Sequence, residues 1–172
     1  MQNDETLKNV TQFSSLSPVP GFRRWILKMM DSDQSSLGKL TSFSEILNLS
    51  SVETIGVENY SDFRELVASL DPQLLPKFSD SLPQLLFKYL YSERGVDDSA
   101  LCPVCNFHVR NGAELWRLNF AANTAHYGMS ESLSMMVNYR YYTDKMWQNS
   151  YDYQVQKIIP ISDSFRSSFL EK

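Results

Sequence analysis

The stretch "VTQFSSLSPVPGFRRWILKMM", residues 10–30, changes from one secondary-structure period to another across a single turn. Apolar and small polar residues alternate up to Ser17, which predicts a β-strand. Pro18 and Pro20 then favour a tight, rigid turn. Beyond the turn, apolar side chains recur at helical spacing with basic residues between them, which predicts an amphipathic helix. A strand that leads directly into a helix predicts a fold that combines both, with Ser17 at the end of the strand.

Three further segments have a clear periodicity. The sequence predicts a helix over residues 81–93 ("SLPQLLFKYLYSE"), which ends near Gly95. It predicts another helix over residues 111–123 ("NGAELWRLNFAAN"), because strong helix formers follow the Asn-Gly pair. Residues 133–142 ("LSMMVNYRYY") alternate and predict a half-buried strand.

The other segments complete the predicted organisation. Residues 31–80 are rich in serine and aspartate, and they predict short helices in a variable surface insertion. The tail predicts a short strand or helix before Pro160 and a final helix capped by Ser162 or Asp163. We therefore expect a single domain over residues 1–172 that belongs to the α/β (α+β) class.

Composition and charge exclude several classes of protein. The chain has 172 residues, 42% of them hydrophobic, which is enough for one domain with a real core. The formal net charge of −4, with scattered lysines and arginines, excludes the basic surface that a nucleic acid partner requires. The apolar runs are far too short for a membrane span, and residues 1–10 do not resemble a leader peptide. We expect a soluble intracellular protein.

Both cysteines lie close to a histidine in "ALCPVCNFHVRNG", residues 100–112. A zinc site would need Cys102, Cys105, His108 and also His126, which are all the cysteines and histidines of the chain. A redox dithiol requires a helix start that lowers the thiol pKa, and the residues after Cys105 do not resemble one. We favour two buried, inert cysteines beside a proline turn. His108 is then either a structural or a catalytic histidine in a loop.

Four segments together resemble a known enzyme family. "SSLSPVPGFRRW", "KYLYSERG", "PVCNFHVRNGAELWRLNFAAN" and "SLSMMVNYRYY", in that order, are similar to the C-terminal half of malonyl-CoA decarboxylase. The resemblance extends from Phe13 to about Ser162. It implies part of a domain like the GCN5-related N-acetyltransferases, with a mixed sheet flanked by helices. It also implies an enzyme of fatty acid metabolism that converts malonyl-CoA to acetyl-CoA and carbon dioxide.

The same resemblance implies the site residues. The serine of "SP.PGF" and the histidine of "FH..NGA" are catalytic in the family, and these are Ser17 and His108 here. The tyrosine of "NYRY", Tyr141, is a further active-site residue by the same resemblance. Asparagine and arginine residues at other motif positions are implied to bind the substrate: Asn106, Asn111, Asn138 and Arg140. Two alternatives stay open, because Asn111 also suits a helix cap and Tyr141 also suits the core.

The chemistry explains why the family uses these residue types. Loss of carbon dioxide from a malonyl thioester leaves an enolate whose charge lies on the thioester oxygen, so no metal, biotin or pyridoxal is needed. The protein must supply a hydrogen-bond donor to that oxygen and a proton to the new methyl carbon. Ser17 and His108 suit these tasks, and the sequence leaves open which of them delivers the proton.

The chain departs from the family pattern in two ways. Cys102 and Cys105 replace small or polar residues, which weakens the zinc interpretation. The family's helical domain, early strands and phosphate-binding loop are not recognisable, so we expect either a truncated gene model or a degenerate paralogue with a bare sheet edge and little activity alone. Alternative functions are an inactive acyl-CoA- or protein-binding remnant and a small zinc module. The family allows a homo-oligomer and a cytoplasmic, mitochondrial or peroxisomal location.

Overall fold

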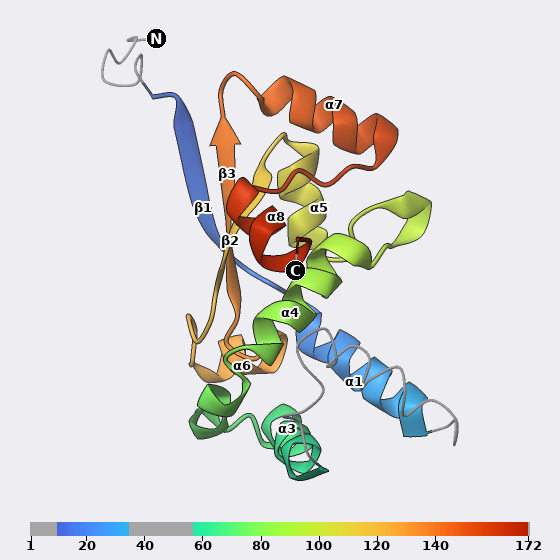
Figure 1. Cartoon of the computed structure of the whole chain (residues 1–172), viewed down its shortest axis with the longest axis vertical. Helices are drawn as coiled ribbons and strands as arrows, with labels where there is room; N and C mark the ends of the chain where they lie inside the picture. The colour runs from blue at the N-terminus through green and yellow to red at the C-terminus, as the bar shows by residue number, and fades with distance from the viewer. Residues whose placement is uncertain (1–9, 35–56, 172) are drawn as a thin grey trace.

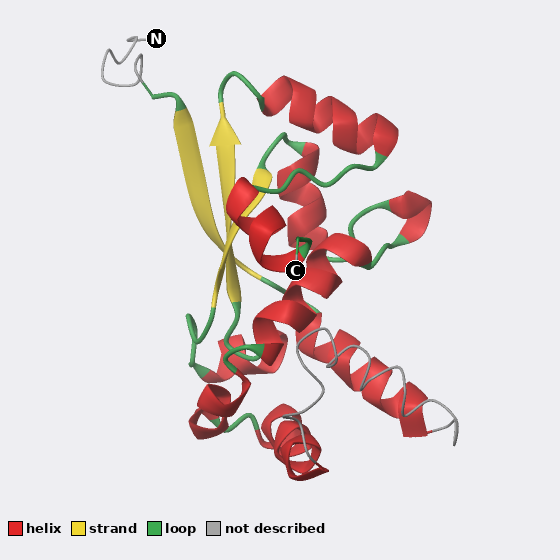
Figure 2. Cartoon of the chain, in the orientation of Figure 1, coloured by secondary structure: helices red, strands yellow, loops and turns green. Residues whose placement is uncertain are grey.

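The computed structural model describes residues 10–34 and 57–171. Its strands lie along one side of the molecule, and the helices gather on the other side and below (Figures 1 and 2). The strands are β1 (Gln12–Pro18), β2 (Glu114–Asn119) and β3 (Met136–Tyr142). The predicted combination of strands and helices is confirmed.

The three strands form one antiparallel sheet in the order β1-β3-β2. A parallel bridge between Leu115 and Ile161 lies at the outer edge of β2. At the opposite edge, β1 pairs only with β3 among the described residues. Because β3 is central, its side chains contact residues from both of the other strands.

Helices and helical turns make up most of the remaining described chain. They are α1 (Phe22–Gln34), α3 (Val57–Ser69), η2 (Pro72–Phe78), α4 (Ser81–Phe87), η3 (Lys88–Ser92), η4 (Val96–Asp98), α5 (Pro103–Arg110), α6 (His126–Ser132), α7 (Met146–Gln156) and α8 (Asp163–Phe169). None of the helices in the described ranges has the length and apolarity needed to cross a bilayer.

Several sequence predictions are confirmed by these bounds. The strand at residues 12–18, the helix that follows it, the helix at residues 81–92 and the strand at residues 136–142 all lie where the periodicity placed them. Ser162 caps α8, because its hydroxyl accepts a hydrogen bond from the Phe165 amide. In the segment 31–80, α3 and η2 are helical, whereas residues 35–56 lie outside the described residues. The assignment of this segment as an insertion stays a prediction.

The helix predicted over residues 111–123 is wrong, because its central residues form the strand β2. The register shifts between Leu115 and Arg117, so β2 has a bulge at this point. The bulge adds one residue, and Leu115 and Leu118 therefore face the same side although they are three positions apart. This spacing imitates a helical period. Pairing with β3 and burial of Leu115 outweigh the helix propensity of the segment.

The loop predicted around His108 is also wrong, because residues 103–110 form the helix α5. Pro103 begins the helix, a position at which the missing N–H of proline costs no hydrogen bond. The helix ends where Gly112 adopts a φ of +87°. The amides of Gly112 and Ala113 donate to the carbonyl oxygens of Val109 and His108 at 3.0 and 3.1 Å. This pair of bonds defines a Schellman motif, which terminates α5 at Arg110, two residues after His108.

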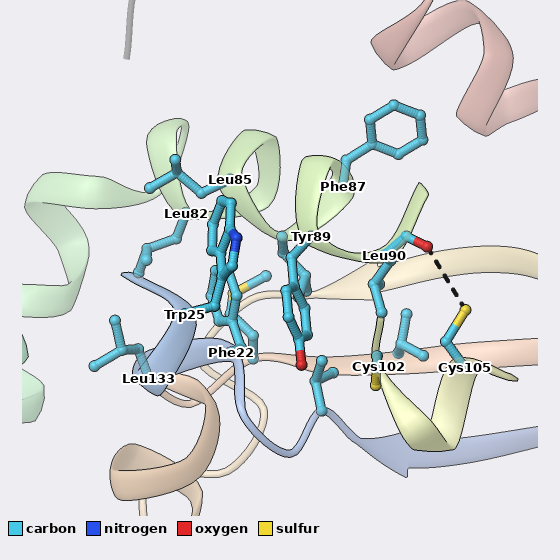
Figure 3. Close-up of a cluster of buried hydrophobic side chains, with 14 of the residues drawn as sticks. Phe22, Trp25, Leu82, Leu85, Phe87, Tyr89, Leu90, Cys102, Cys105 and Leu133 are labelled. Atoms are coloured by element: carbon cyan, nitrogen blue, oxygen red, sulfur yellow. Dashed lines mark hydrogen bonds between the residues drawn. The ribbon is translucent and has the colours of Figure 1, made fainter. Parts of the chain in front are cut away.

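Aromatic packing fixes the turn that follows Ser17. The rings of Phe22, Trp25 and Tyr89 pack against one another with centroid distances of 5.6–6.1 Å, and Figure 3 shows them between α1 and α4–η3. The hydroxyl of Tyr89 donates a hydrogen bond to the Pro20 carbonyl at 2.9 Å. A buried aromatic cluster and a hydrogen bond therefore hold the strand end that carries Ser17.

Candidate active site

Ser17, His108 and Tyr141 are joined by hydrogen bonds although they come from β1, α5 and β3. Ser17 Oγ lies 3.0 Å from His108 Nε2, across 91 positions of sequence. His108 Nδ1 lies 2.6 Å from the Tyr141 hydroxyl. The prediction that these side chains converge is confirmed, and the imidazole is held at both of its nitrogen atoms.

Strand register explains why the three side chains meet. Ser17 pairs with Val137, and Phe13 pairs with Tyr141, so Ser17 and Tyr141 project from the same face of the sheet. The helix α5 lies against this face, since the His108 ring stacks on Tyr139 of β3. His108 is in the last turn of α5, where the Schellman motif holds its carbonyl.

Burial shifts the pKa values of His108 and Tyr141. Burial lowers the pKa of His108, although the C-terminal end of a helix favours a cation. The imidazole is therefore neutral near pH 7. Burial also raises the pKa of Tyr141, so its phenol keeps its proton. A neutral imidazole between two hydroxyl groups is suited to transfer a proton.

Two residues of the site were not among the sequence predictions. Ser15 Oγ lies 3.1 Å from Ser17 Oγ, and the Tyr139 ring stacks on His108 with a centroid distance of 4.1 Å and an interplanar angle of 17°. Both residues lie two positions before a predicted site residue on the same strand. Strand alternation could have indicated both residues, because residues two positions apart on a strand share a face of the sheet.

Asn138 and Arg140 lie on the other face of the sheet. They alternate with Val137, Tyr139 and Tyr141 along β3, so their side chains point away from His108. The Arg140 guanidinium stacks over the Trp116 ring, 3.3 Å from its centroid. Asn138 donates to the Ser15 carbonyl and accepts from Asn119. The structure does not bring these two residues to the Ser17 site, and their role in binding substrate stays a prediction.

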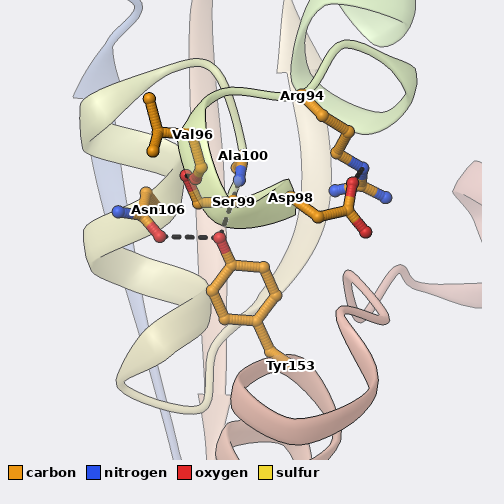
Figure 4. A network of polar contacts seen from close by, with 7 residues as sticks. All are labelled: Arg94, Val96, Asp98, Ser99, Ala100, Asn106 and Tyr153. Atoms are coloured by element: carbon orange, nitrogen blue, oxygen red, sulfur yellow. Dashed lines mark hydrogen bonds and ion pairs between the residues drawn. The ribbon is translucent and has the colours of Figure 1, made fainter.

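Asn106 lies on α5 and Asn111 is the C-cap of this helix, and both side chains make structural contacts. The Asn106 side-chain oxygen accepts a hydrogen bond from the Tyr153 hydroxyl at 2.6 Å, and this hydroxyl accepts one from the Ala100 amide at 2.8 Å (Figure 4). Asn111 is exposed at the C-terminal end of α5 and donates to the Phe107 carbonyl. The capping alternative for Asn111 thus matches its geometry, at a helix end rather than a helix start. Substrate binding by either residue stays a prediction.

Comparison with known families identifies the arrangement. Residues 2–171 match the family model described as "Malonyl-CoA decarboxylase C-terminal domain". The chain belongs to this family. The resemblance seen in the four sequence motifs is therefore confirmed over almost the whole chain. The likeness to the GCN5-related N-acetyltransferases stays a prediction.

Relatives of this decarboxylase family are found by sequence and by structure. Mitochondrial malonyl-CoA decarboxylase of the goose Anser anser anser is 36% identical over 95% of this chain and 34% of its own length. The Rattus norvegicus protein of the same name is 35% identical over 90% of this chain and 32% of its own length. The crystal structure of malonyl-CoA decarboxylase from Rhodopseudomonas palustris matches with a TM-score of 0.69 and 26% identity, over 92% of this chain and 33% of that chain. This chain thus spans about a third of the length of its relatives.

The two cysteines are free and buried in this member of the decarboxylase family. Cys102 is the N-cap of α5, so the sequence argument that no helix begins there was wrong. Burial nevertheless raises the pKa of both thiols, which disfavours the thiolate that redox chemistry requires. Cys105 instead contacts the Leu90 carbonyl at 3.8 Å (Figure 3). Within the described ranges, no cluster of three or more His, Cys, Asp or Glu side chains is arranged to hold a metal ion.

Two cavities in the described part of the chain lie beside this site rather than in it. One, of about 460 Å³, is lined by residues of α1 with Tyr89 and Pro103. The other, of about 510 Å³, lies at the outer edge of β2. Ser17, His108 and Tyr141 line neither cavity.

Proposed function

We propose that this chain carries the reaction centre of a malonyl-CoA decarboxylase, a carboxy-lyase that releases acetyl-CoA and carbon dioxide. The observation that carries the proposal is the continuous hydrogen-bonded series from Ser17 through His108 to Tyr141. Membership of the decarboxylase family supports the reaction type. Because the chain spans about a third of its relatives, the activity of the whole protein is part of the proposal.

We assign a direction to these hydrogen bonds from the proton that the Tyr141 phenol keeps. A neutral phenol is a better donor than acceptor, so Tyr141 donates to Nδ1 of His108. The neutral imidazole then carries its proton on Nε2 and donates it to Ser17 Oγ. In turn, the Ser17 hydroxyl donates its own proton, to Ser15 when no substrate is bound. The series therefore ends in a donor that can be directed at a substrate oxygen.

Decarboxylation begins when the bond between the malonyl α-carbon and its carboxylate breaks. The electron pair of this bond moves to the α-carbon and the thioester oxygen, and carbon dioxide leaves. The Ser17 hydroxyl donates a hydrogen bond to the oxygen, where negative charge develops. Such a donor contributes roughly 3–4 kcal/mol to stabilisation of the transition state. Ser17 is 6% exposed, so little water competes for this contact.

Protonation of the enolate completes the reaction. The Ser17 proton moves to the α-carbon, the Nε2 proton of His108 moves to Ser17 Oγ, and the Tyr141 proton moves to Nδ1. The product is a far weaker carbon acid than a phenol, so this transfer is downhill. Tyr141 is only partly buried, and its phenolate regains a proton from water. The net change is the replacement of carbon dioxide by one proton.

The proposed location follows the names of the relatives. The goose and rat proteins are named as mitochondrial, and we propose the same compartment for the protein that contains this chain. Fractionation of the native cells tests this directly. Recovery of the protein with cytoplasmic or peroxisomal markers would contradict the proposal.

Kinetics in a protein of full family length test the proposed reaction. We suggest a chimera in which this chain replaces the matching third of the goose enzyme, with acetyl-CoA release from malonyl-CoA as the assay. Ser17→Ala and His108→Ala each remove one member of the series. We expect kcat to fall roughly 100-fold or more in each variant, since each substitution removes a charge-stabilising donor or a proton source.

Matched control variants come from the same chain. Ser14→Ala changes the exposed serine on the opposite face of β1, and His126→Ala changes the exposed second histidine. Both should keep the wild-type kcat. A wild-type chimera that binds malonyl-CoA but releases no acetyl-CoA would contradict the proposed function and support the inactive-remnant alternative. Turnover that survives both Ser17→Ala and His108→Ala would contradict the assigned roles.

A further inference from the structure

We propose that Tyr139 is a positioning residue for this site, because the face of its ring holds the His108 imidazole in the plane where Nε2 meets Ser17 and Nδ1 meets Tyr141. The consequence for catalysis rests on the proposed function. The positioning itself is a statement about the geometry of His108, and it can be measured without any turnover.

The contact between the two rings is face to face. Their centroids lie 4.1 Å apart with an interplanar angle of 17°. By comparison, Tyr141 meets His108 at an angle of 60° and a centroid distance of 6.0 Å, so it contacts the ring through its hydroxyl and not its face. Hydrogen bonds at the two nitrogen atoms set the direction of the imidazole within its plane. The Phe107 ring meets the imidazole at 77° with a centroid distance of 5.3 Å, so among these three rings it is the face of Tyr139 that lies parallel to the imidazole and fixes its tilt.

Tyr139 is itself immobilised by its surroundings. Its exposed fraction is 0%, and it occupies the central strand of the sheet between Ser15 and Leu115. Close packing leaves a large buried ring with few alternative rotamers, so it acts as a rigid surface. The imidazole is therefore supported by a regular strand instead of a loop, which is the arrangement that holds catalytic geometry most accurately.

The ring of Tyr139, and not its hydroxyl, makes this contact. The hydroxyl is buried near the Cys105 thiol, and no donor or acceptor in the described residues lies in hydrogen-bonding geometry with it. An unpaired buried hydroxyl is a net cost to folding. Phenylalanine at this position would keep the stacking face and remove that cost. A matched pair of substitutions can thus separate the ring from the hydroxyl.

Tyr139 also affects the protonation of His108 by excluding water from one face of the imidazole. Burial is the cause of the lowered pKa of His108. The other titratable and charged groups on the elements packed around the imidazole are Tyr139, Arg140, Tyr141 and Tyr142 of β3, Cys105 and Arg110 of α5, Glu114 and Arg117 of β2, and Tyr151, Asp152 and Tyr153 of α7. No charge among them is a cause of the shift. Removal of the ring therefore changes the pKa of His108 by hydration alone.

Nuclear magnetic resonance of the histidine rings in the full 172-residue chain tests the proposal. The chain has two histidines, and the exposed His126 serves as an internal control. In the wild type we expect the ring protons of His108 to resonate upfield of those of His126, because an aromatic face shields a stacked neighbour. Tyr139→Phe should keep this shift and the low pKa of His108. Tyr139→Leu should abolish the shift and raise the pKa toward the ordinary value of about 6.5.

Each outcome decides the proposal. Absence of the upfield shift in the wild type overturns it without any variant. An unchanged His108 pKa in Tyr139→Leu, or an equal change in Tyr139→Phe, overturns the role of the ring face. The dispersion of the amide signals shows whether Tyr139→Leu folds. If it does not fold, the proposal is decided by the upfield shift of the His108 ring protons in the wild type and by whether Tyr139→Phe keeps it. Loss of the proposed decarboxylase activity affects none of these readouts, so the two proposals fail separately.

Discussion

The Tyr141 hydroxyl lies 2.6 Å from Nδ1 of His108, on the side of the imidazole opposite to Ser17. Burial raises the pKa of the Tyr141 phenol, so it keeps its proton and has one to donate. In the proposed mechanism Tyr141 donates this proton to Nδ1, which leaves the imidazole proton on Nε2. This single contact links the strand β3 to the proton that Ser17 receives.

Tyr141→Phe tests the importance of this bond. We expect kcat to fall about 10- to 100-fold with little change in KM, because the substitution removes a proton donor that does not hold the substrate. Steady-state kinetics in the full-length chimera measure both constants. Tyr142→Phe, on the opposite face of the same strand, is the matched control and should leave kcat unchanged. A raised KM at constant kcat would instead assign Tyr141 to substrate binding.

Ser15→Ala should have a smaller effect than Ser17→Ala. The Ser15 hydroxyl lies 3.1 Å from Ser17 and orients it without contact to His108. A neutral hydrogen bond contributes about 0.5–1.5 kcal/mol, so we expect kcat to fall about 2- to 10-fold. Ser14→Ala, from the exposed face of β1, is again the control. A loss equal to that of Ser17→Ala would show that Ser15 takes part in the chemistry.

The lowered pKa of His108 makes folding stability depend on pH. The folded protein binds the proton of this imidazole less readily than the unfolded chain, where the pKa is about 6.5. The contribution of neutral His108 is therefore complete above the unfolded pKa and is lost as the pH falls toward the folded pKa. His108→Gln should lose less stability than the wild type between pH 7.5 and pH 5. Urea unfolding at the two pH values measures the difference.

The matching substitution at the second histidine completes that experiment. His126 is exposed, so His126→Gln should keep the pH dependence of the wild type. An equal loss in the free energy of unfolding between pH 7.5 and pH 5 in the wild type and in His108→Gln would mean that His108 is not buried in its neutral form.

Gly112→Ala should destabilise the fold and displace His108. Gly112 has a φ of +87°, which side chains rarely adopt, and an added Cβ would overlap the Met146 carbonyl oxygen. We expect a loss of at least about 2 kcal/mol in the free energy of unfolding. Chemical denaturation measures it. Gly95→Ala is the control, because the φ of Gly95 is −95° and the nearest atom to its added Cβ is Ser99 Oγ at 3.3 Å. Similar losses in both variants would contradict this explanation.

The sequence predicted elements best where one regular period continued without interruption. The alternation before Pro18 and in residues 136–142 gave two correct strands, and the helical spacing in residues 81–92 gave a correct helix. Prediction failed at β2 because the bulge between Leu115 and Arg117 replaces the strand period with one that looks helical. It failed at α5 because the helix is short and its end depends on the Schellman motif at Gly112.

By itself, the sequence determined the residue types of the site, the strand that ends at Ser17 and the family to which the motifs belong. These properties depend on local spacing and on the order of motifs along the chain. Only the tertiary structure decided which side chains meet, because contact across 91 positions depends on strand register and on the packing of α5 against the sheet. Register placed Ser15 beside Ser17 and Tyr139 against His108, and it turned Asn138 and Arg140 to the other face. A shift of one residue along β3 would turn Asn138 and Arg140 toward His108 and Tyr139 and Tyr141 away from it, and strand alternation alone does not say which of the two faces meets α5.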